Sequence, residues 1–427
     1  MTFKLKKGFL LGVASSATQI EGGELGHNWN DWYLRGKIAC GSNPARANDH
    51  YNRWREDADL MIGMGIKAYR FGIEWARLCP SEGTVDGSAV AHYRKEMAYL
   101  KERGVSLLLT IHHFTNPMWF EEKGGFSKTG NIKYFIDYAA LVVRSFGDLV
   151  SEYITINEPN IYAVSSYYAG VWPPGEKSMR KAFKVMSILS CCHIQAYELI
   201  HKMRLDMGYH DTKVSYTNAV SLFEPADPRN LWHRINAALI ERLLQRSITE
   251  SMCLGNFRFP LKAPIKIKRK LYCDFIAINY YSRTTISKFD LGMRKGAPKN
   301  DLGWEIYPEG IVRCAEKLHR LLGLPIYITE NGTCDNNDTF RCLYIYDHLK
   351  ALSGSDLPIE RYYHWCFADN FEWLEGEAAR FGLVHVDYET QKRTVKNSGY
   401  FYSEVIKAGG VTEENFEKYV KDQEYHY

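Results

Sequence analysis

Eight short apolar runs recur along the chain, with amphipathic segments between them. The runs are rich in β-branched and aromatic residues, which favour strands. They cover residues 9–14, 67–73, 106–113, 153–157, 213–219, 275–279, 325–329 and 362–367. Most are continuously apolar rather than alternating, which is typical of parallel strands covered on both faces. The pattern therefore predicts a parallel sheet.

The segments between these runs predict helices that cover the sheet. One set of apolar residues lies at helical spacing between the third and fourth runs: Ile132, Phe135, Ile136, Ala139, Val143 and Phe146. Residues 181–205 and 231–250 also have a helical pattern. Alternation of strand and helix without a Pro/Gly-rich linker or a change of composition predicts one α/β domain over residues 1–427, a (β/α)8 TIM barrel. A doubly wound open sheet is the alternative, but no GxGxxG follows an early strand.

Composition narrows the function classes. Of the 427 residues 45% are hydrophobic, and the net charge is only +4, too weak a bias to favour nucleic acid as a partner. The ten cysteines form no CxxC pairs, which predicts free thiols in a reducing compartment. The apolar run at residues 9–14 is shorter than a signal peptide requires, and no other run approaches the roughly 18 residues of a membrane span. We expect a cytoplasmic protein without a membrane partner; the oligomeric state stays open.

Polar side chains stand where several of the predicted strands end. In a (β/α)8 barrel the active site is built at these C-terminal ends. Taken singly, each residue has a structural explanation: His113 could be a satisfied structural histidine, and Arg70 could pair with any nearby acid. Two carboxylates, Glu158 and Glu330, nevertheless end different apolar runs, each beside an asparagine. Two carboxyl groups facing each other across a sugar are what cleavage of a glycosidic bond requires.

The segments around these residues resemble the motifs of the retaining β-glycosidases of glycoside hydrolase family 1. The two carboxylates stand in "TINEPN" and "YITENG". The other matching segments are "ATQIEGG", "YRFGIEWARL", "LTIHHFTNPMWF", "AINYYS", "GWEIYPEG" and "WCFADNFEWLEGEAARFGLVHVD". They follow one another in the family's order over the first 410 or so residues.

The resemblance implies catalytic roles for five positions. Glu158 would be the general acid/base, and Glu330 the nucleophile. Arg70 and Tyr281 would orient the nucleophile, and Asn279 would support the same side of the site. In this arrangement the two carboxyl groups should lie about 5 to 5.5 Å apart, as the retaining mechanism requires.

The resemblance also implies how the transferred sugar, the glycone, is bound. The residues expected to hold it come from several strand ends: Gln19, His113, Asn157, Trp365, Glu372 and Trp373. Trp172 in "GVWPPG" would line the entrance on the side of the leaving group, the aglycone. No metal or other cofactor is implied, and the partner would be a small β-glycoside or a short oligosaccharide.

Three positions depart from the family's pattern. Phe114 stands where many members have Trp, and Glu74 replaces a smaller residue. Cys366 stands where Ser or Gly often follows the tryptophan expected to lie under the sugar, Trp365. The preferred aglycone and the choice among glucose, galactose and fucose therefore stay open.

The resemblance predicts a β-glucosidase-type hydrolase that removes terminal β-D-glucosyl residues, and also galactosyl or fucosyl residues, by double displacement. A 6-phospho-β-glycosidase is one alternative, but Glu372 would repel phosphate and "WLEGEAA" (373–379) contains no lysine. A sugar-binding protein without activity would be expected to lack one of the two glutamates. A metal-dependent hydrolase using His112 and His113 is disfavoured because adjacent strand residues point to opposite faces.

Overall fold

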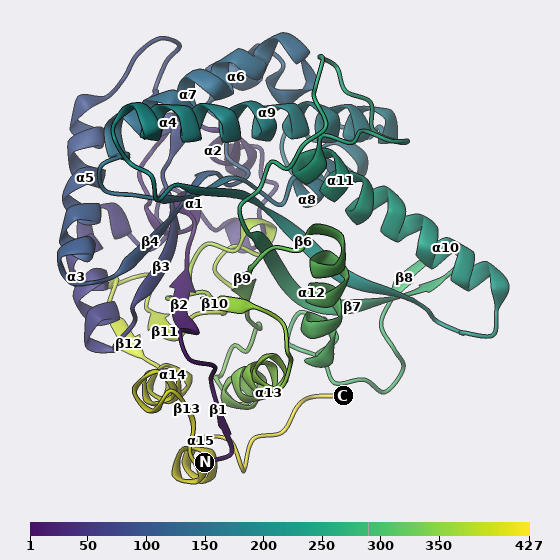
Figure 1. Cartoon of the computed structure of the whole chain (residues 1–427). Coiled ribbons are helices and arrows are strands. Elements are labelled where there is room, and N and C mark those ends of the chain that lie inside the picture. Colours follow the sequence, from purple (N-terminus) through teal and green to yellow (C-terminus); the bar gives the residue numbers. More distant parts are fainter. Residues whose placement is uncertain (289) are drawn as a thin grey trace.

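Eight parallel strands close into a barrel in the computed structural model, which describes residues 1–288 and 290–427 (Figure 1). The strand order is β6-β5-β4-β3-β2-β10-β9-β7, and pairing of β6 with β7 closes the ring. The strands are β2 (Leu10–Ala14), β3 (Ala68–Gly72), β4 (Ser106–His112), β5 (Glu152–Asn157), β6 (Lys213–Pro225), β7 (Ile276–Ser287), β9 (Ile326–Asn331) and β10 (Ile359–Trp365). All eight predicted strands are present, and the predicted TIM barrel is confirmed.

Helices follow the strands and form the outer layer. The long ones are α3 (His50–Gly63), α5 (Gly87–Glu102), α7 (Ile132–Phe146), α9 (Met179–Asp206), α10 (Leu231–Glu241), α11 (Ser247–Leu254), α12 (Glu309–Leu322), α13 (Arg341–Ser353) and α14 (Asn397–Ala408). Their starts follow from local chemistry: the Asp86 carboxylate accepts hydrogen bonds from the first amides of α5, and Asn230 does the same for α10.

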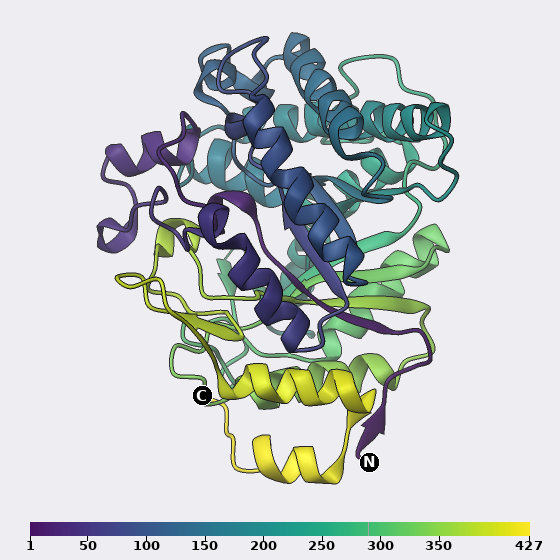
Figure 2. The same cartoon turned by 90° about the vertical axis from the view of Figure 1, so that its left-hand side faces the viewer.

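The two ends of the chain meet. Strand β1 (Phe3–Lys4) pairs with β13 (Gly410–Val411), which lies between α14 and the last helix, α15 (Glu413–Tyr419). Figure 2 shows both C-terminal helices beside the N-terminal strand. Among the described residues, no helix has a stretch long and apolar enough to cross a membrane. The thiols of all ten cysteines are free, as the sequence predicts.

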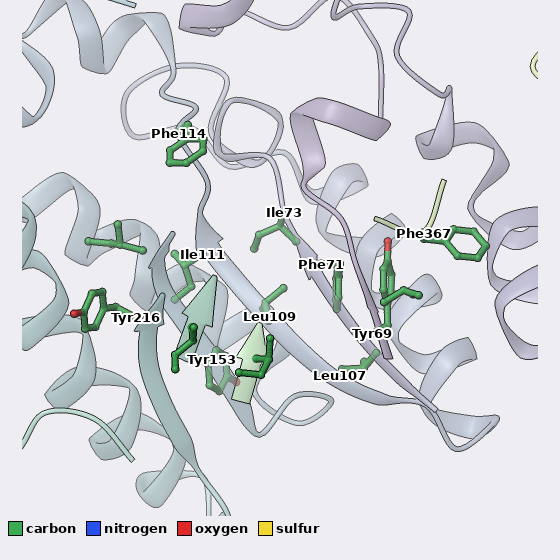
Figure 3. Close-up of a cluster of buried hydrophobic side chains, with 14 of the residues drawn as sticks. Tyr69, Phe71, Ile73, Leu107, Leu109, Ile111, Phe114, Tyr153, Tyr216 and Phe367 are labelled. Atoms are coloured by element: carbon green, nitrogen blue, oxygen red, sulfur yellow. The ribbon is translucent and has the colours of Figure 1, made fainter. Parts of the chain in front are cut away.

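Alternate residues of the strands build two layers of core. Tyr69, Phe71, Leu107, Leu109 and Ile111 belong to the layer between the barrel and its helices (Figure 3). The intervening positions form a second cluster that fills the barrel itself: Ala14, Ala68, Leu108, Ile154, Phe275, Ala277, Tyr327 and Tyr363. Because the interior is filled, polar side chains can meet a ligand only near the ends of the strands.

Two strands run further than the sequence pattern predicts. The run at 213–219 continues as β6 to Pro225, and the run at 275–279 continues as β7 to Ser287. Beyond a register shift the two stay paired, with Leu222 opposite Arg283 and Pro225 opposite Ile286, and β8 (Asp290–Gly292) adds to the free edge of β7. The pairing partner, which the local pattern does not reveal, explains the extra length.

The structure does not have the single continuous helix predicted at residues 231–250. A π-helical segment, Arg242–Arg246, separates α10 from α11. In it the Gln245 side-chain amide donates to the Ser221 carbonyl of β6 at 3.0 Å. Such wide turns are frequent near functional sites.

A buried charge network ties the outer layer together. The His50 ring bonds Asp57 on the same helix (2.7 Å) and Glu96 on α5 (3.1 Å). Arg393 of β12 (Arg393–Val395) donates to Asp57 at 2.8 Å. Burial opposes the charge on His50, but Glu96 and Asp57 outweigh it and raise the pKa of His50 to about 10. His50 is therefore a buried cation that holds two acidic side chains.

We expect His50→Gln to lower the apparent free energy of unfolding by about 3 to 5 kcal/mol near pH 6, because it removes the cation beside the buried Glu96 carboxylate and leaves Asp57 with Arg393 alone. His50 binds its proton more tightly in the folded chain, so this stabilisation is complete below pH 6.5 and disappears as the pH rises through about 10. The difference between the variant and the parent should shrink over that range in urea unfolding. His210→Gln, at an exposed site, is the control. An equal loss at pH 6 and pH 10 would contradict the assignment.

Candidate active site

One fully buried guanidinium lies under the C-terminal ends of the strands. Arg70 of β3 donates from Nη1 to the Glu330 carboxylate and to the Thr329 carbonyl (3.2 Å). Its Nη2 donates to Asn157 Oδ1 at 2.6 Å, and its Nε to Thr110 Oγ1 at 3.2 Å. Arg70 thereby joins β3, β4, β5 and β9, and fixes Glu330 relative to Asn157.

Glu330, at the end of β9, has a second donor. The Tyr281 hydroxyl donates to Glu330 Oε2 at 2.6 Å. The next residue, Asn331, points away and is buried: its amide donates to the Tyr280 carbonyl (2.7 Å), and its oxygen accepts from Tyr362 (2.9 Å). A Cβ at Gly332 would lie 1.8 Å from the Trp365 carbonyl oxygen, so only glycine fits there. Of the three residues in "ENG", only Glu330 contacts Arg70 and Tyr281, whereas Asn331 and Gly332 hold the local backbone in place.

Glu158, the other carboxylate, has different surroundings. The Asn279 amide donates to Glu158 Oε1 at 2.7 Å and to Asn157 Oδ1 at 3.1 Å. Thr329 Oγ1 in turn donates to Asn279 Oδ1 at 2.8 Å, which ties Asn279 to β9. The Glu158 backbone is left-handed (φ 42°), and Pro159 begins helix α8 (Pro159–Ala163) directly after it. A left-handed non-glycine residue costs about 1 to 3 kcal/mol, and such strain gathers at functional sites.

Register shifts bring these side chains into the barrel mouth. Pairing of β5 with β6 is irregular between Ile154 and Asn157. The partners of Ile278 and Asn279 on β9 are Ile328 and Glu330, with one residue skipped. Shifts of this kind re-aim a side chain from one face of a sheet to the other.

The residues expected to bind the sugar lie around these carboxylates. The Gln19 amide donates to Glu372 Oε2 and to Asn370 Oδ1, both at 3.1 Å. The His113 ring lies nearly parallel to Trp365 (5.8 Å, 22°) and to Trp373 (6.0 Å, 23°). Asn370, which positions Gln19, was not predicted, although it stands within the "WCFADNFEW" segment.

A cavity of about 750 Å³ opens over this group. Ten of the predicted site residues line it: His113, Asn157, Glu158, Trp172, Asn279, Tyr281, Glu330, Trp365, Glu372 and Trp373. Gln19 and Arg70 are fully buried beneath it. His112 points elsewhere and bonds Asn116 at 2.9 Å. Trp172 also packs on Phe114 (4.8 Å), so it is both lining and core.

The outer part of the cavity contains residues that the sequence did not single out. They are apolar and come from α8, the turn Val164–Ala169 after it, β6, the π-helical segment, β8 and the loop after β8: Ile161, Val164, Phe223, Leu244, Leu291, Met293, Leu302 and Trp304. Trp304 lies in one of the matching segments, "GWEIYPEG". No motif marks the other seven, because their side chains come together only in the folded chain.

Comparison with known proteins identifies the family. The model of glycosyl hydrolase family 1 matches residues 1–411. The chain belongs to glycosyl hydrolase family 1. β-Glucosidase A of Thermotoga maritima is 33% identical over 96% of this chain and 99% of that protein. The predicted family is thereby confirmed, and with it the prediction of a β-glucosidase-type glycoside hydrolase at the level of the family.

Solved structures of the family agree in fold. The β-glycosidase from Pyrococcus horikoshii superimposes with a TM-score of 0.89 at 33% identity and covers 98% of both chains. A β-glucosidase from Thermotoga maritima in complex with glucoimidazole gives 0.87 at 32% identity, over 96% of this chain and 100% of that one.

The three departures from the family's pattern have distinct surroundings in this hydrolase. Phe114 lines the cavity with a left-handed backbone (φ 68°). Glu74 is buried and accepts from Thr18, next to Gln19, at 2.6 Å; burial raises its pKa to about 7 despite this bond. Cys366 lies behind the site, where its sulfur accepts from Asn370 at 3.1 Å. Only Phe114 faces the cavity directly.

The titratable groups at the cavity of the hydrolase have shifted pKa values. Burial and the nearby Glu330 charge raise the pKa of Glu158 to about 8, against the hydrogen bond from Asn279. Burial and Glu330 likewise raise the pKa of Glu372 to about 8, although Trp365 and Gln19 donate to it. Burial and the Arg70 charge hold the pKa of His113 well below its usual value, so its ring is neutral. Glu330 itself accepts hydrogen bonds from Arg70 and Tyr281.

Glu158 should therefore carry its proton at pH 7 and lose it as the pH rises through about 8. We expect Glu330→Gln to lower this pKa, because the neutral amide removes a like charge. Titration by ¹³C NMR of glutamate-labelled protein measures it, with the Glu158 signal assigned by its loss in Glu158→Gln. Glu375→Gln, also at the cavity, is the control and should leave the pKa in place. An unchanged pKa in Glu330→Gln would show that the two groups are too far apart to interact.

Proposed function

We propose that this family 1 hydrolase is a retaining β-glycosidase that removes terminal β-D-glucosyl residues, and also galactosyl or fucosyl residues, from small β-glycosides. The observation that carries the proposal is the contrast between two carboxyl groups at one cavity. Glu330 accepts from a cation and a phenol, whereas Glu158 accepts from a neutral amide and has a raised pKa. A charged nucleophile and a protonated acid are the pair that the first step of retention needs.

In the first step, a Glu330 oxygen attacks the anomeric carbon while the bond from that carbon to the aglycone oxygen breaks. The Glu158 proton passes to the departing oxygen. Because Glu158 keeps its proton up to about pH 8, it can act as an acid at neutral pH. Arg70 and Tyr281 hold the Glu330 carboxylate in place for the attack.

In the second step, water replaces the enzyme at the anomeric carbon. Esterification has removed the Glu330 charge, one of the two main causes of the raised Glu158 pKa, so Glu158 can now accept a proton. Glu158 takes a proton from the attacking water, and the bond between Glu330 and the sugar breaks. Two inversions give net retention of the β-configuration.

The remaining groups suit a neutral sugar. Gln19 and Glu372 offer paired polar atoms, and His113 Nδ1 is buried without a hydrogen-bond partner among the described residues. Buried orphan groups of this kind are satisfied when a hydroxyl binds. No lysine is found among the described residues that line the cavity, which disfavours the 6-phospho-glycoside alternative. We also keep the prediction of a cytoplasmic location, which ten free thiols support.

We expect Glu330→Gly to abolish hydrolysis of 4-nitrophenyl β-D-glucoside, and added formate to restore part of the turnover by occupying the space of the carboxylate. Glu330→Gln is the matched control, since its side chain fills that space and formate should not restore turnover. Circular dichroism must accompany the assay, because both variants leave the buried Arg70 charge unpaired. Trapping with a 2-fluoro sugar that labels a residue other than Glu330 would refute the assignment.

We expect Glu158→Ala to lower kcat about 10²- to 10⁴-fold on glucosides with poor leaving groups, the usual value of a general acid. A dinitrophenyl glucoside, which needs no proton, should still form the covalent intermediate. Azide should then give the β-glucosyl azide, detected by NMR, whereas the parent enzyme should give only the free sugar. An α-azide would mean that the roles or the mechanism are wrong.

A further inference from the structure

The cavity has two chemically different ends. Its inner end holds the carboxyl groups Glu158, Glu330 and Glu372, together with His113 and Asn157. Its outer end extends along β6, β7 and β8, which run out beyond the barrel beside α10 (Figure 1). Under the double-displacement mechanism the inner end takes the glycone, so whatever leaves with the aglycone oxygen lies along the outer end.

The outer wall presents apolar side chains to the cavity. Phe223 of β6, Leu244 of the π-helical segment, and Leu291 and Met293 at β8 form one side of it. Leu291 is 61% exposed and Met293 is 39% exposed, although both line the cavity. Large apolar side chains left open at the rim of a cavity mark a surface that gains free energy when a ligand covers it.

The polar side chains of the same wall are largely occupied by protein partners. Gln245 donates to the Ser221 carbonyl (3.0 Å), and the Ser221 hydroxyl donates to the Ser282 carbonyl (2.9 Å). The Arg283 guanidinium is paired with Glu305 at 2.8 Å. These groups have little hydrogen-bonding capacity left for a ligand.

A few polar groups are exceptions. Asn160 Oδ1 is buried without a hydrogen-bond partner among the described residues, Glu375 stands at the rim, and the indole N–H of Trp304 has no protein partner in the described part of the chain. They could serve some hydroxyls of a ligand, but a second sugar ring carries several, and each hydroxyl that loses water without a new partner weakens binding.

We propose that the outer part of this cavity binds an extended apolar aglycone, an alkyl chain or a fused hydrocarbon ring system, in preference to a second sugar. The proposal rests on the proposed function. The hydrocarbon would lie against Phe223, Leu244, Leu291 and Met293 while the sugar occupies the inner end. The preferred substrates are then amphiphilic β-glycosides rather than oligosaccharides.

The test is kcat/KM for a series of alkyl β-D-glucosides, from methyl through butyl and hexyl to octyl, below the concentration at which micelles form, with cellobiose for comparison. Burying one methylene is worth about fourfold at most. We expect a rise of at least about tenfold from butyl to octyl, and octyl glucoside to exceed cellobiose. A flat or falling series, or cellobiose as the better substrate, would overturn the proposal.

A double variant assigns the effect to the wall. Leu291→Asn with Met293→Gln should reduce the rise from butyl to octyl to less than about threefold, and both sites are exposed enough to tolerate polar side chains. Leu205→Asn is the control: Leu205 is 56% exposed near the end of α9, next to Arg204, which bonds the Val150 carbonyl at the opposite end of the barrel. A rise that persists in the double variant would refute the assignment. If no glucoside at all is hydrolysed, 4-nitrophenyl glucoside included, the proposed function itself fails.

Discussion

A buried arginine is the constraint on which the site depends. The Arg70 guanidinium is closed off from solvent, and a charge in that position is tolerable only with acceptors on every side. The barrel supplies them from three other strands: Thr110, Asn157, and Glu330 with the Thr329 carbonyl. The ion pair between Arg70 and Glu330 is not needed for the stability of the fold as such, because apolar residues often replace buried pairs of this kind without loss of stability. Its effect is to fix the position of one carboxylate, Glu330, relative to Asn157.

The second carboxyl group, Glu158, has no cation as a hydrogen-bond partner among the described residues. Glu158 has an amide partner where Glu330 has a cation, and it lies close enough to the Glu330 charge for its pKa to rise. Strain accompanies this placement: Glu158, Phe114 and Trp373 all have left-handed backbones at the cavity. Three strained residues in one site are consistent with a surrounding structure that determines their geometry at a cost in stability.

The inner and outer parts of the cavity follow from different levels of structure. The inner residues stand at the ends of barrel strands, where the family's motifs lie. The outer wall depends on how far β6 and β7 continue as a pair, and on a π-helical segment that turns Leu244 toward the cavity. Variation outside the barrel can therefore change the aglycone without disturbing the carboxyl pair, which separates specificity from chemistry.

The sequence alone determined the eight strands, the barrel and the family, and it singled out Glu158 and Glu330 as the candidate pair, because apolar runs and contiguous motifs are local properties. Which side chains face the cavity is not local. Strict alternation from Thr110, Ile154 and Tyr327, whose side chains face the barrel interior, would put His112, Ile156 and Asn331 at the mouth. The structure instead places His113, Asn157 and Glu330 there. At β5 and β9 the switch coincides with register shifts between neighbouring strands, and such a shift is a property of a strand pair. The extent of β6 and β7 was likewise decided only by the tertiary structure, since backbone hydrogen bonds between segments about 60 residues apart leave no periodic signal in either one.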